Sequence, residues 1–171
     1  TFAQIHDRIA RLAGALQPFW LTRGAWSEGR RWLEEALAID DPAHDLAWPD
    51  RGSGGTVDEA VRAKALYGAG MLTRFQGDYA RARMLCDQSL ALYRRLADPT
   101  GVVEALVELC RISSFQDDQT ATQAFLAEAA SQLENLPDTV VKASAYSELV
   151  VTMVRPGSLQ YPGQAARYLA E

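Results

Sequence analysis

Residues 65–96 read ALYGAGMLTRFQGDYARARMLCDQSLALYRRL, and this stretch decides the fold. An apolar helical pattern runs to Phe75, the triplet QGD interrupts it, and a second helical pattern follows. Gly77 suits a left-handed turn after the first helix, and Asp78 can cap the second. The stretch therefore predicts a helical hairpin. Apolar and small residues at steps of three and four lie on one face of its second helix: Tyr79, Ala82, Cys86, Ser89, Leu90 and Tyr93.

The same plan recurs forty residues later in ALVELCRISSFQDDQTATQAFLAEAASQL, residues 105–133. There Asp117 stands where Gly77 stands in the first copy. After another forty residues, Ala145, Leu149 and Gly157 keep the register. A chain of stacked helical units with a fixed period is typical of solenoid proteins. The matching positions are Ala65, Leu66, Phe75 and Gln76 with Ala105, Leu106, Phe115 and Gln116.

Residues 20–37, WLTRGAWSEGRRWLEEAL, interleave aromatic and basic side chains, a pattern compatible with a nucleic-acid surface or with a packed hairpin. Gly24 aligns with Gly77 after a shift of 53 residues. That shift puts Trp26, Gly29, Leu33 and Ala36 in the register of Tyr79, Ala82, Cys86 and Ser89. We therefore expect the tryptophans to pack and the arginines to face solvent, with Arg30 beside Glu34 and Arg31 beside Glu35.

These registers predict an all-α fold of about four helix-turn-helix hairpins, the last one truncated. The expected hairpins cover residues 2–39, 56–97, 99–135 and 138–171, and residues 40–55 form a linker rich in Asp, Pro and Gly. Thr56 and Glu59 have capping-box spacing, which predicts that the second hairpin begins there. Small residues at positions 29, 82 and 166 allow the paired helices to approach closely. We expect the chain to be one repeat domain cut from a longer protein.

The amino-acid composition argues against several classes of function. The net charge is −5 and the isoelectric point is about 5.1, whereas a domain that binds the phosphate backbone usually carries a basic excess. No apolar run is long enough to span a bilayer, and the N-terminus lacks the pattern of a signal peptide. Cys86 and Cys110 are too few for a disulfide framework, so we expect buried thiols in a reducing, cytoplasmic compartment. We expect no direct nucleic-acid or membrane partner.

No constellation for catalysis, cofactor binding or metal binding emerges. The glycine-rich RGSGGT at residues 51–56 lacks the lysine and the preceding strand of a phosphate-binding loop. His6 and His44 each precede an aspartate, but adjacent helical residues point about 100° apart and no nucleophile is indicated. We therefore predict a non-catalytic protein that needs no cofactor and no metal.

The hairpin pattern resembles the tetratricopeptide repeat, with Leu66 at its usual Trp position, Gly70 at its first small position, and Ala82 and Ser89 at its second-helix positions. The forty-residue period and the missing Trp depart from the common 34-residue form. The resemblance implies a right-handed α-solenoid whose first helices line a concave face that binds a protein, a peptide or a small-molecule inducer. Relatives that grip a terminal carboxylate use Lys and Asn where this chain has Tyr67 and Met71, so we do not expect that clamp. The inward positions would be Lys64, Tyr67, Met71, Arg74, Glu104, Val107, Glu108, Arg111, Ser144 and Ser147.

A narrower resemblance covers residues 12–37 and 63–96, and most of it is carried by residues 23–37, RGAWSEGRRWLEEAL. This segment is similar to the repeat region of large bacterial signal-transduction ATPases of the MalT-like and AfsR-like kind, many of which carry a LuxR-type DNA-binding domain. The resemblance implies a sensor segment that also contacts neighbouring domains of a cytoplasmic transcriptional regulator. Two alternatives stay open: a general scaffold or adaptor of the same fold, and a repeat region attached to a kinase or cyclase.

Overall fold

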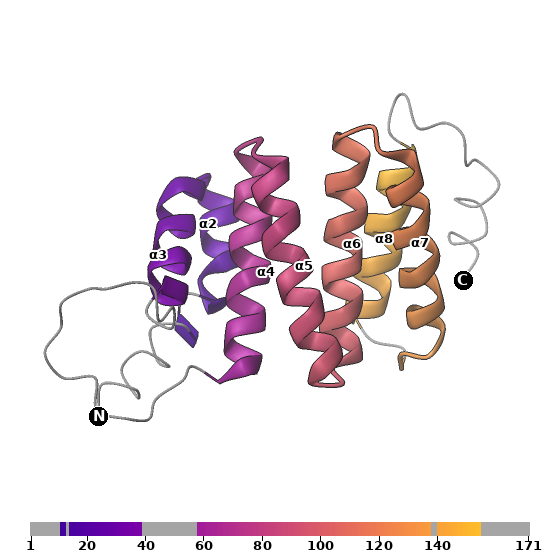
Figure 1. Cartoon of the computed structure of the whole chain (residues 1–171), viewed down its shortest axis with the longest axis horizontal. Coiled ribbons are helices and arrows are strands. Elements are labelled where there is room, and N and C mark those ends of the chain that lie inside the picture. Colours follow the sequence, from indigo (N-terminus) through magenta and orange to yellow (C-terminus); the bar gives the residue numbers. More distant parts are fainter. Residues whose placement is uncertain (1–10, 13, 39–57, 138–139, 155–171) are drawn as a thin grey trace, which may run out of the picture. The chain divides into compact units, whose positions relative to one another are not determined.

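The computed structural model describes residues 11–12, 14–38, 58–137 and 140–154 (Figure 1). Within these residues the chain forms α-helices and no strand, as the sequence predicts. It divides into two compact units, Thr1–Leu92 and Tyr93–Glu171, and α5 runs through the boundary. The helices are α2 (Gln17–Arg23), α3 (Trp26–Ala38), α4 (Glu59–Phe75), α5 (Tyr79–Arg95), α6 (Pro99–Phe115), α7 (Gln119–Glu134) and α8 (Val140–Val154).

The same backbone turn ends α4, α5 and α6. At the end of α4 the N–H of Gly77 donates to the carbonyl of Arg74 at 2.9 Å, and the N–H of Asp78 donates to that of Thr73 at 3.3 Å. These paired bonds define a helix ending with one left-handed residue. That residue is Gly77 (φ 83°) after α4, Ala97 (φ 51°) after α5 and Asp117 (φ 56°) after α6. The match between Gly77 and Asp117 was predicted, whereas the turn at Ala97 was not.

An aspartate directly follows each left-handed residue and begins the next helix. The carboxylate of Asp98 accepts hydrogen bonds from the backbone N–H groups of Thr100 and Gly101, each at 3.1 Å. Asp78 and Asp118 accept in the same way from Arg81 and Ala121. Helices α4 to α7 consequently start at residues 59, 79, 99 and 119, so one helix and its turn occupy twenty residues. The predicted forty-residue period therefore corresponds to two helices with their turns.

The predicted start of α4 is wrong by a few residues. Its first residue is Glu59, and Asp58 caps it by accepting from the N–H of Ala60 at 3.0 Å, whereas Thr56 lies outside the described residues. A capping box needs its Ser or Thr directly before the helix. Asp58 occupies that place, and a carboxylate caps as well as a hydroxyl does.

In the first unit, α3 packs against both α2 and α4. Trp20 of α2 and Leu33 of α3 share one buried cluster with residues of α4 and α5. The helices approach closely where glycine faces a large side chain: a Cβ on Gly29 would lie 2.5 Å from the Trp20 ring, and one on Gly70 would lie 2.5 Å from the Cys86 sulfur. These contacts confirm the predicted role of a small residue at position 29. The cluster members from α4 and α5 are Ala65, Leu66, Ala69, Leu72 and Leu85.

The register that relates the first two hairpins is confirmed by burial. Gly29, Leu33 and Ala36 are buried on α3, and Ala82, Cys86 and Ser89 are buried at the matching places on α5. Trp26 and Tyr79, which begin the two series, are both half-buried. The hydroxyl of Ser89 donates to the carbonyl of Ala63 on α4 at 2.8 Å, so this small polar residue fixes α5 on α4.

In the second unit, α6 packs against both α7 and α8. The forty-residue register is visible in the buried positions: Leu109 and Leu149 on α6 and α8 correspond to Ala69 on α4. Ser113 repeats Thr73, since each is fully buried and donates its hydroxyl to the carbonyl four residues earlier. Hairpins of equivalent register therefore build both units. Across the part of the chain that the structure describes, none of the helices is both long and apolar enough to cross a membrane.

Candidate functional site

The predicted inward residues of the first unit follow one another along α4. Lys64 is exposed and Tyr67 is half-buried. Met71 and Arg74 are each only 8% exposed. The side-chain amide of Gln17 on α2 donates to the sulfur of Met71 at 3.1 Å, which holds these two helices together. Lys64 and Tyr67 are therefore the members of this set that a ligand can reach most readily.

A stack of one guanidinium group and two aromatic rings lies beside this row, and it was not predicted. The Arg74 guanidinium lies over the ring of Phe75, 4.3 Å from its centre. The Phe75 ring stacks in turn on Trp26 of α3, with 5.3 Å between ring centroids. The indole nitrogen of Trp26 is buried and has no hydrogen-bond partner. The sequence does place Phe75 just before the turn of the second hairpin and Trp26 just after the equivalent turn of the first. The helical periodicity alone did not show that the two rings are in contact.

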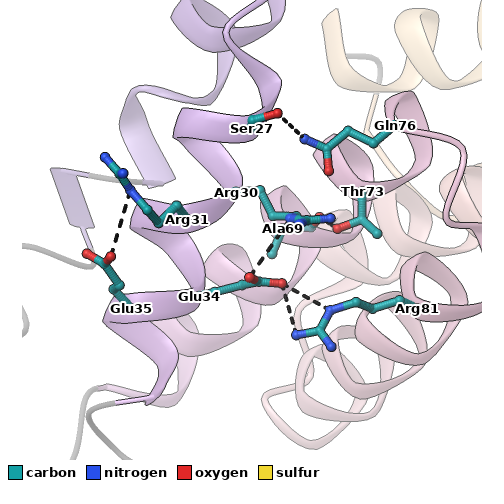
Figure 2. A network of polar contacts seen from close by, with 9 residues as sticks. All are labelled: Ser27, Arg30, Arg31, Glu34, Glu35, Ala69, Thr73, Gln76 and Arg81. Atoms are coloured by element: carbon teal, nitrogen blue, oxygen red, sulfur yellow. Dashed lines mark hydrogen bonds and ion pairs between the residues drawn. The ribbon is translucent and has the colours of Figure 1, made fainter.

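Arg30 and Arg31 of residues 20–37 take part in polar contacts with acidic side chains (Figure 2), whereas Arg23 is exposed. The Glu34 carboxylate binds Arg81 of α5 at 3.0 Å and lies 3.9 Å from Arg30. Arg31 pairs with Glu35 at 3.8 Å, so both predicted local pairs are confirmed. The side chain of Gln76, at the end of α4, donates to the Ser27 hydroxyl of α3 at 2.9 Å. This network connects the first hairpin to the second.

The tryptophans of the same segment are not all packed. Trp20 is 3% exposed and Trp26 is half-buried, as expected. Trp32 is 44% exposed, so the expectation that it packs is wrong. A shift of 53 residues relates it to Leu85, which is buried in the cluster between the first two hairpins. Trp32 thus occupies by register a position that is buried in the second hairpin but exposed in the first.

The other predicted residues belong to the second unit. On α6, Glu108 is 1% exposed, and its carboxylate binds the guanidinium of Arg111 at 3.2 Å. Val107 is buried, whereas Glu104 is half-buried. Ser144 and Ser147 are exposed on α8, which packs against α6. This row offers a ligand one reachable carboxylate and two hydroxyls, in contrast to the amine and phenol of the α4 row.

The two cysteines are buried and free, as predicted. Burial raises the pKa of the Cys110 thiol from 9.0 to about 12, against a smaller lowering effect of the Arg111 charge. A thiol in that state is a weak nucleophile and a poor metal ligand at neutral pH. Among the described residues, no group of three His, Cys, Asp or Glu side chains could hold a metal ion.

Three features of the sequence lie outside the described residues: His6, His44 and the glycine-rich residues 51–56. The small residue expected at position 166 lies outside them too. Comparison of the sequence with protein-family models and with curated proteins gives no match.

Proposed function

We propose that the chain is a non-catalytic binding segment, a right-handed α-solenoid of tetratricopeptide-like hairpins that holds a protein, peptide or small inducer on the face formed by its first helices. The observation that carries this proposal is the recurrence of one hairpin: the same turn, the same aspartate cap and the same buried register appear in both units. Units that repeat in this way stack on their neighbours and present extended surfaces suited to binding.

Each unit has its own row of residues for such a ligand. In the first unit, α4 presents the amine of Lys64 and the phenol of Tyr67. In the second unit, α6 and α8 present the carboxylate of Glu104 and the hydroxyls of Ser144 and Ser147. Side chains of mixed polarity suit a peptide better than an ion or an apolar ligand. The narrower resemblance of residues 23–37 extends the proposal to a role: a ligand that favours one curvature of the array would shift an adjoining ATPase between off and on states.

The binding proposal is tested by selecting random phage-displayed peptides on the 171-residue chain. The best peptide is then titrated against the unit 1 variant Lys64→Glu/Tyr67→Ala and the unit 2 variant Glu104→Lys/Ser147→Arg. We expect at least one of these variants to lose about tenfold or more in affinity. The matched controls Gln88→Lys and Ser131→Arg, at exposed positions on α5 and α7, should bind as the parent does.

Two outcomes would overturn the binding proposal. One is the absence of any peptide that competes with itself at a single site. The other is a peptide whose affinity falls only in the α5 or α7 controls. Circular dichroism of every variant separates lost binding from lost folding. The regulator role has its own test in the complete gene: it fails if no ATPase or DNA-binding domain adjoins this segment.

A further inference from the structure

The predicted inward residues of α4 include one exposed cation, Lys64. In the part of the chain that the structure describes, no carboxylate pairs with its ammonium group. By contrast, Arg11 of the same unit binds Asp58 at 3.3 Å, and Arg81 binds Glu34 at 3.0 Å. The charge of Lys64 is therefore available to a ligand. We call the inward residues of α4 the first-unit row: Lys64, Tyr67, Met71 and Arg74.

The aliphatic stem of Lys64 is held by a neighbouring segment of the first unit. A Cβ built on Gly14 would lie 3.6 Å from Cγ of Lys64 and 3.7 Å from its Cδ. The stem therefore passes close to Gly14, while the residue as a whole stays exposed. A side chain that is already held in place loses less conformational entropy when it binds a ligand.

An aromatic residue lies beside this cation. Tyr67 follows Lys64 by three residues, so the two share one face of α4. Tyr67 is half-buried, and part of its side chain can contact a ligand. Met71 is buried, with the Gln17 amide of α2 donating to its sulfur at 3.1 Å. The reachable part of the first-unit row is thus a cation next to an aromatic side chain, which fits an acidic residue next to an apolar one.

The equivalent position in the second unit carries the opposite charge. The forty-residue register that matches Ala65 with Ala105 places Glu104 where α4 has Lys64. The first-unit row contains no acidic residue, whereas the corresponding row of α6 begins with this glutamate. Hairpins of the same register therefore differ in the charge that they offer a ligand, and the first unit offers a positive one.

We propose that the first-unit row binds an acidic peptide segment, with an Asp or Glu side chain of the segment on Lys64 and an adjacent apolar side chain on Tyr67. This inference rests on the binding function proposed above and specifies the chemistry of the ligand in the first unit. Charge complementarity supports it, because an ammonium group without a partner in the protein gains a charge-assisted hydrogen bond when a carboxylate arrives. A basic segment would bring like charges together at the same place.

Random peptides displayed on phage and selected on the 171-residue chain test the charge of the ligand. The net charge of −5 repels acidic peptides at long range, so their enrichment requires a local cation. We expect the enriched peptides to contain Asp or Glu beside an apolar residue, and to lose about tenfold in affinity with Lys64→Gln. Lys64→Arg, which keeps the charge, should bind within about threefold of the parent.

Ser131→Glu is the matched control, because it changes the net charge by the same amount as Lys64→Gln at an exposed position on α7, in the second unit. It should alter the affinity of an acidic peptide by less than about twofold in physiological salt. Replacing the acidic residue of the peptide by its amide should weaken binding to the parent about tenfold and to Lys64→Gln little further, since the two changes remove one contact.

The possible failures separate this inference from the binding function. Neutral or basic peptides that bind the parent and Lys64→Gln alike would overturn the acidic ligand and leave the binding function in place. Equal losses with Lys64→Gln and Ser131→Glu would show a general effect of charge, which also overturns it. A selection that enriches no peptide overturns both proposals. Circular dichroism of each variant shows whether a loss of affinity comes from a loss of folding.

Discussion

The left-handed residue at each turn sets where one helix stops and the next begins. Gly77 adopts φ 83° without strain, and a Cβ placed there would meet nothing within 4 Å. Ala97 holds φ 51° despite its Cβ, which costs an L-residue roughly 1–2 kcal/mol. The two positions have the same turn bonds, so they form a matched pair in which only the side chain differs.

We expect opposite effects when the two residues are exchanged. Gly77→Ala should lower the free energy of unfolding by about 1 kcal/mol, because the new Cβ is strained but meets no neighbour. Ala97→Gly should raise it by about 0.5–1 kcal/mol, since relief of strain exceeds the added entropy of the unfolded chain. Urea unfolding followed by circular dichroism measures both. A fall in stability for Ala97→Gly would show that this turn is not held by its left-handed conformation.

Single residues also separate the features that the sequence pattern predicts from those that it does not. The turn at Asp117 was predictable, because the motif QDD aligns with QGD and aspartate tolerates a left-handed conformation. The turn at Ala97 was not, since alanine carries no such preference and only Pro99 hints at a helix start. Trp32 was assigned to the core on its apolar character alone, but burial depends on whether another element lies across that face.

At the scale of a helix, the aspartate caps decide the twenty-residue period. An aspartate stands immediately before each of α4, α6 and α7, and its carboxylate accepts from backbone N–H groups of the first turn. Asp98 is the cap with two such bonds. It also stands before Pro99, whose fixed φ suits the first turn of a helix and whose lack of an N–H costs nothing there.

Replacing the cap tests its contribution to the helix. Asp98→Ala should cost about 1 kcal/mol of unfolding free energy, because two N–H groups at the start of α6 lose their acceptor. Asp98→Asn, which keeps an acceptor oxygen, should retain most of the stability. Asp87→Ala serves as the control: this exposed residue lies within α5, and its carboxylate pairs with Arg83 at 3.9 Å in solvent, so its loss should stay within about 0.5 kcal/mol. Thermal and urea unfolding of the three variants measure the change in unfolding free energy. Equal losses of unfolding free energy for Asp98→Ala and Asp87→Ala would refute the capping role.

At the scale of the whole molecule, the periodic pattern of the sequence predicts the helices and most of their buried faces. Leu33, Cys86 and Leu149 were placed by register and are fully buried. The candidate site was harder to predict, because an inward position need not be open. Glu108 is charged, yet its pair with Arg111 lets it lie almost fully buried. Pairing between charged side chains of the same helix decides this case, and the periodic pattern of apolar residues does not record it.

One cysteine lies in each unit, so the two thiols report on the units separately. Cys86 belongs to the first unit and Cys110 to the second, and both are fully buried. Burial raises the pKa of Cys110 from 9.0 to about 12, so the folded thiol resists deprotonation while the unfolded thiol titrates normally. The stability that this difference contributes is complete below pH 9.0 and is lost as the pH rises toward 12, because the unfolded state then releases a proton that the folded state keeps.

Pulsed thiol labelling in urea, below that pH range, therefore measures the opening of each unit. In repeat proteins stability is a sum of local units and their nearest neighbours. We expect Asp118→Ala, which removes the cap of α7, to lower the urea concentration at which Cys110 becomes labelled, and to shift Cys86 labelling less. Gly77→Ala should do the reverse, since its turn lies in the first unit. Mass spectrometry of the two cysteine-containing peptides gives both midpoints from one sample. Equal shifts at both thiols in both variants would mean that the two units unfold as one, with the continuous α5 transmitting the loss from either side.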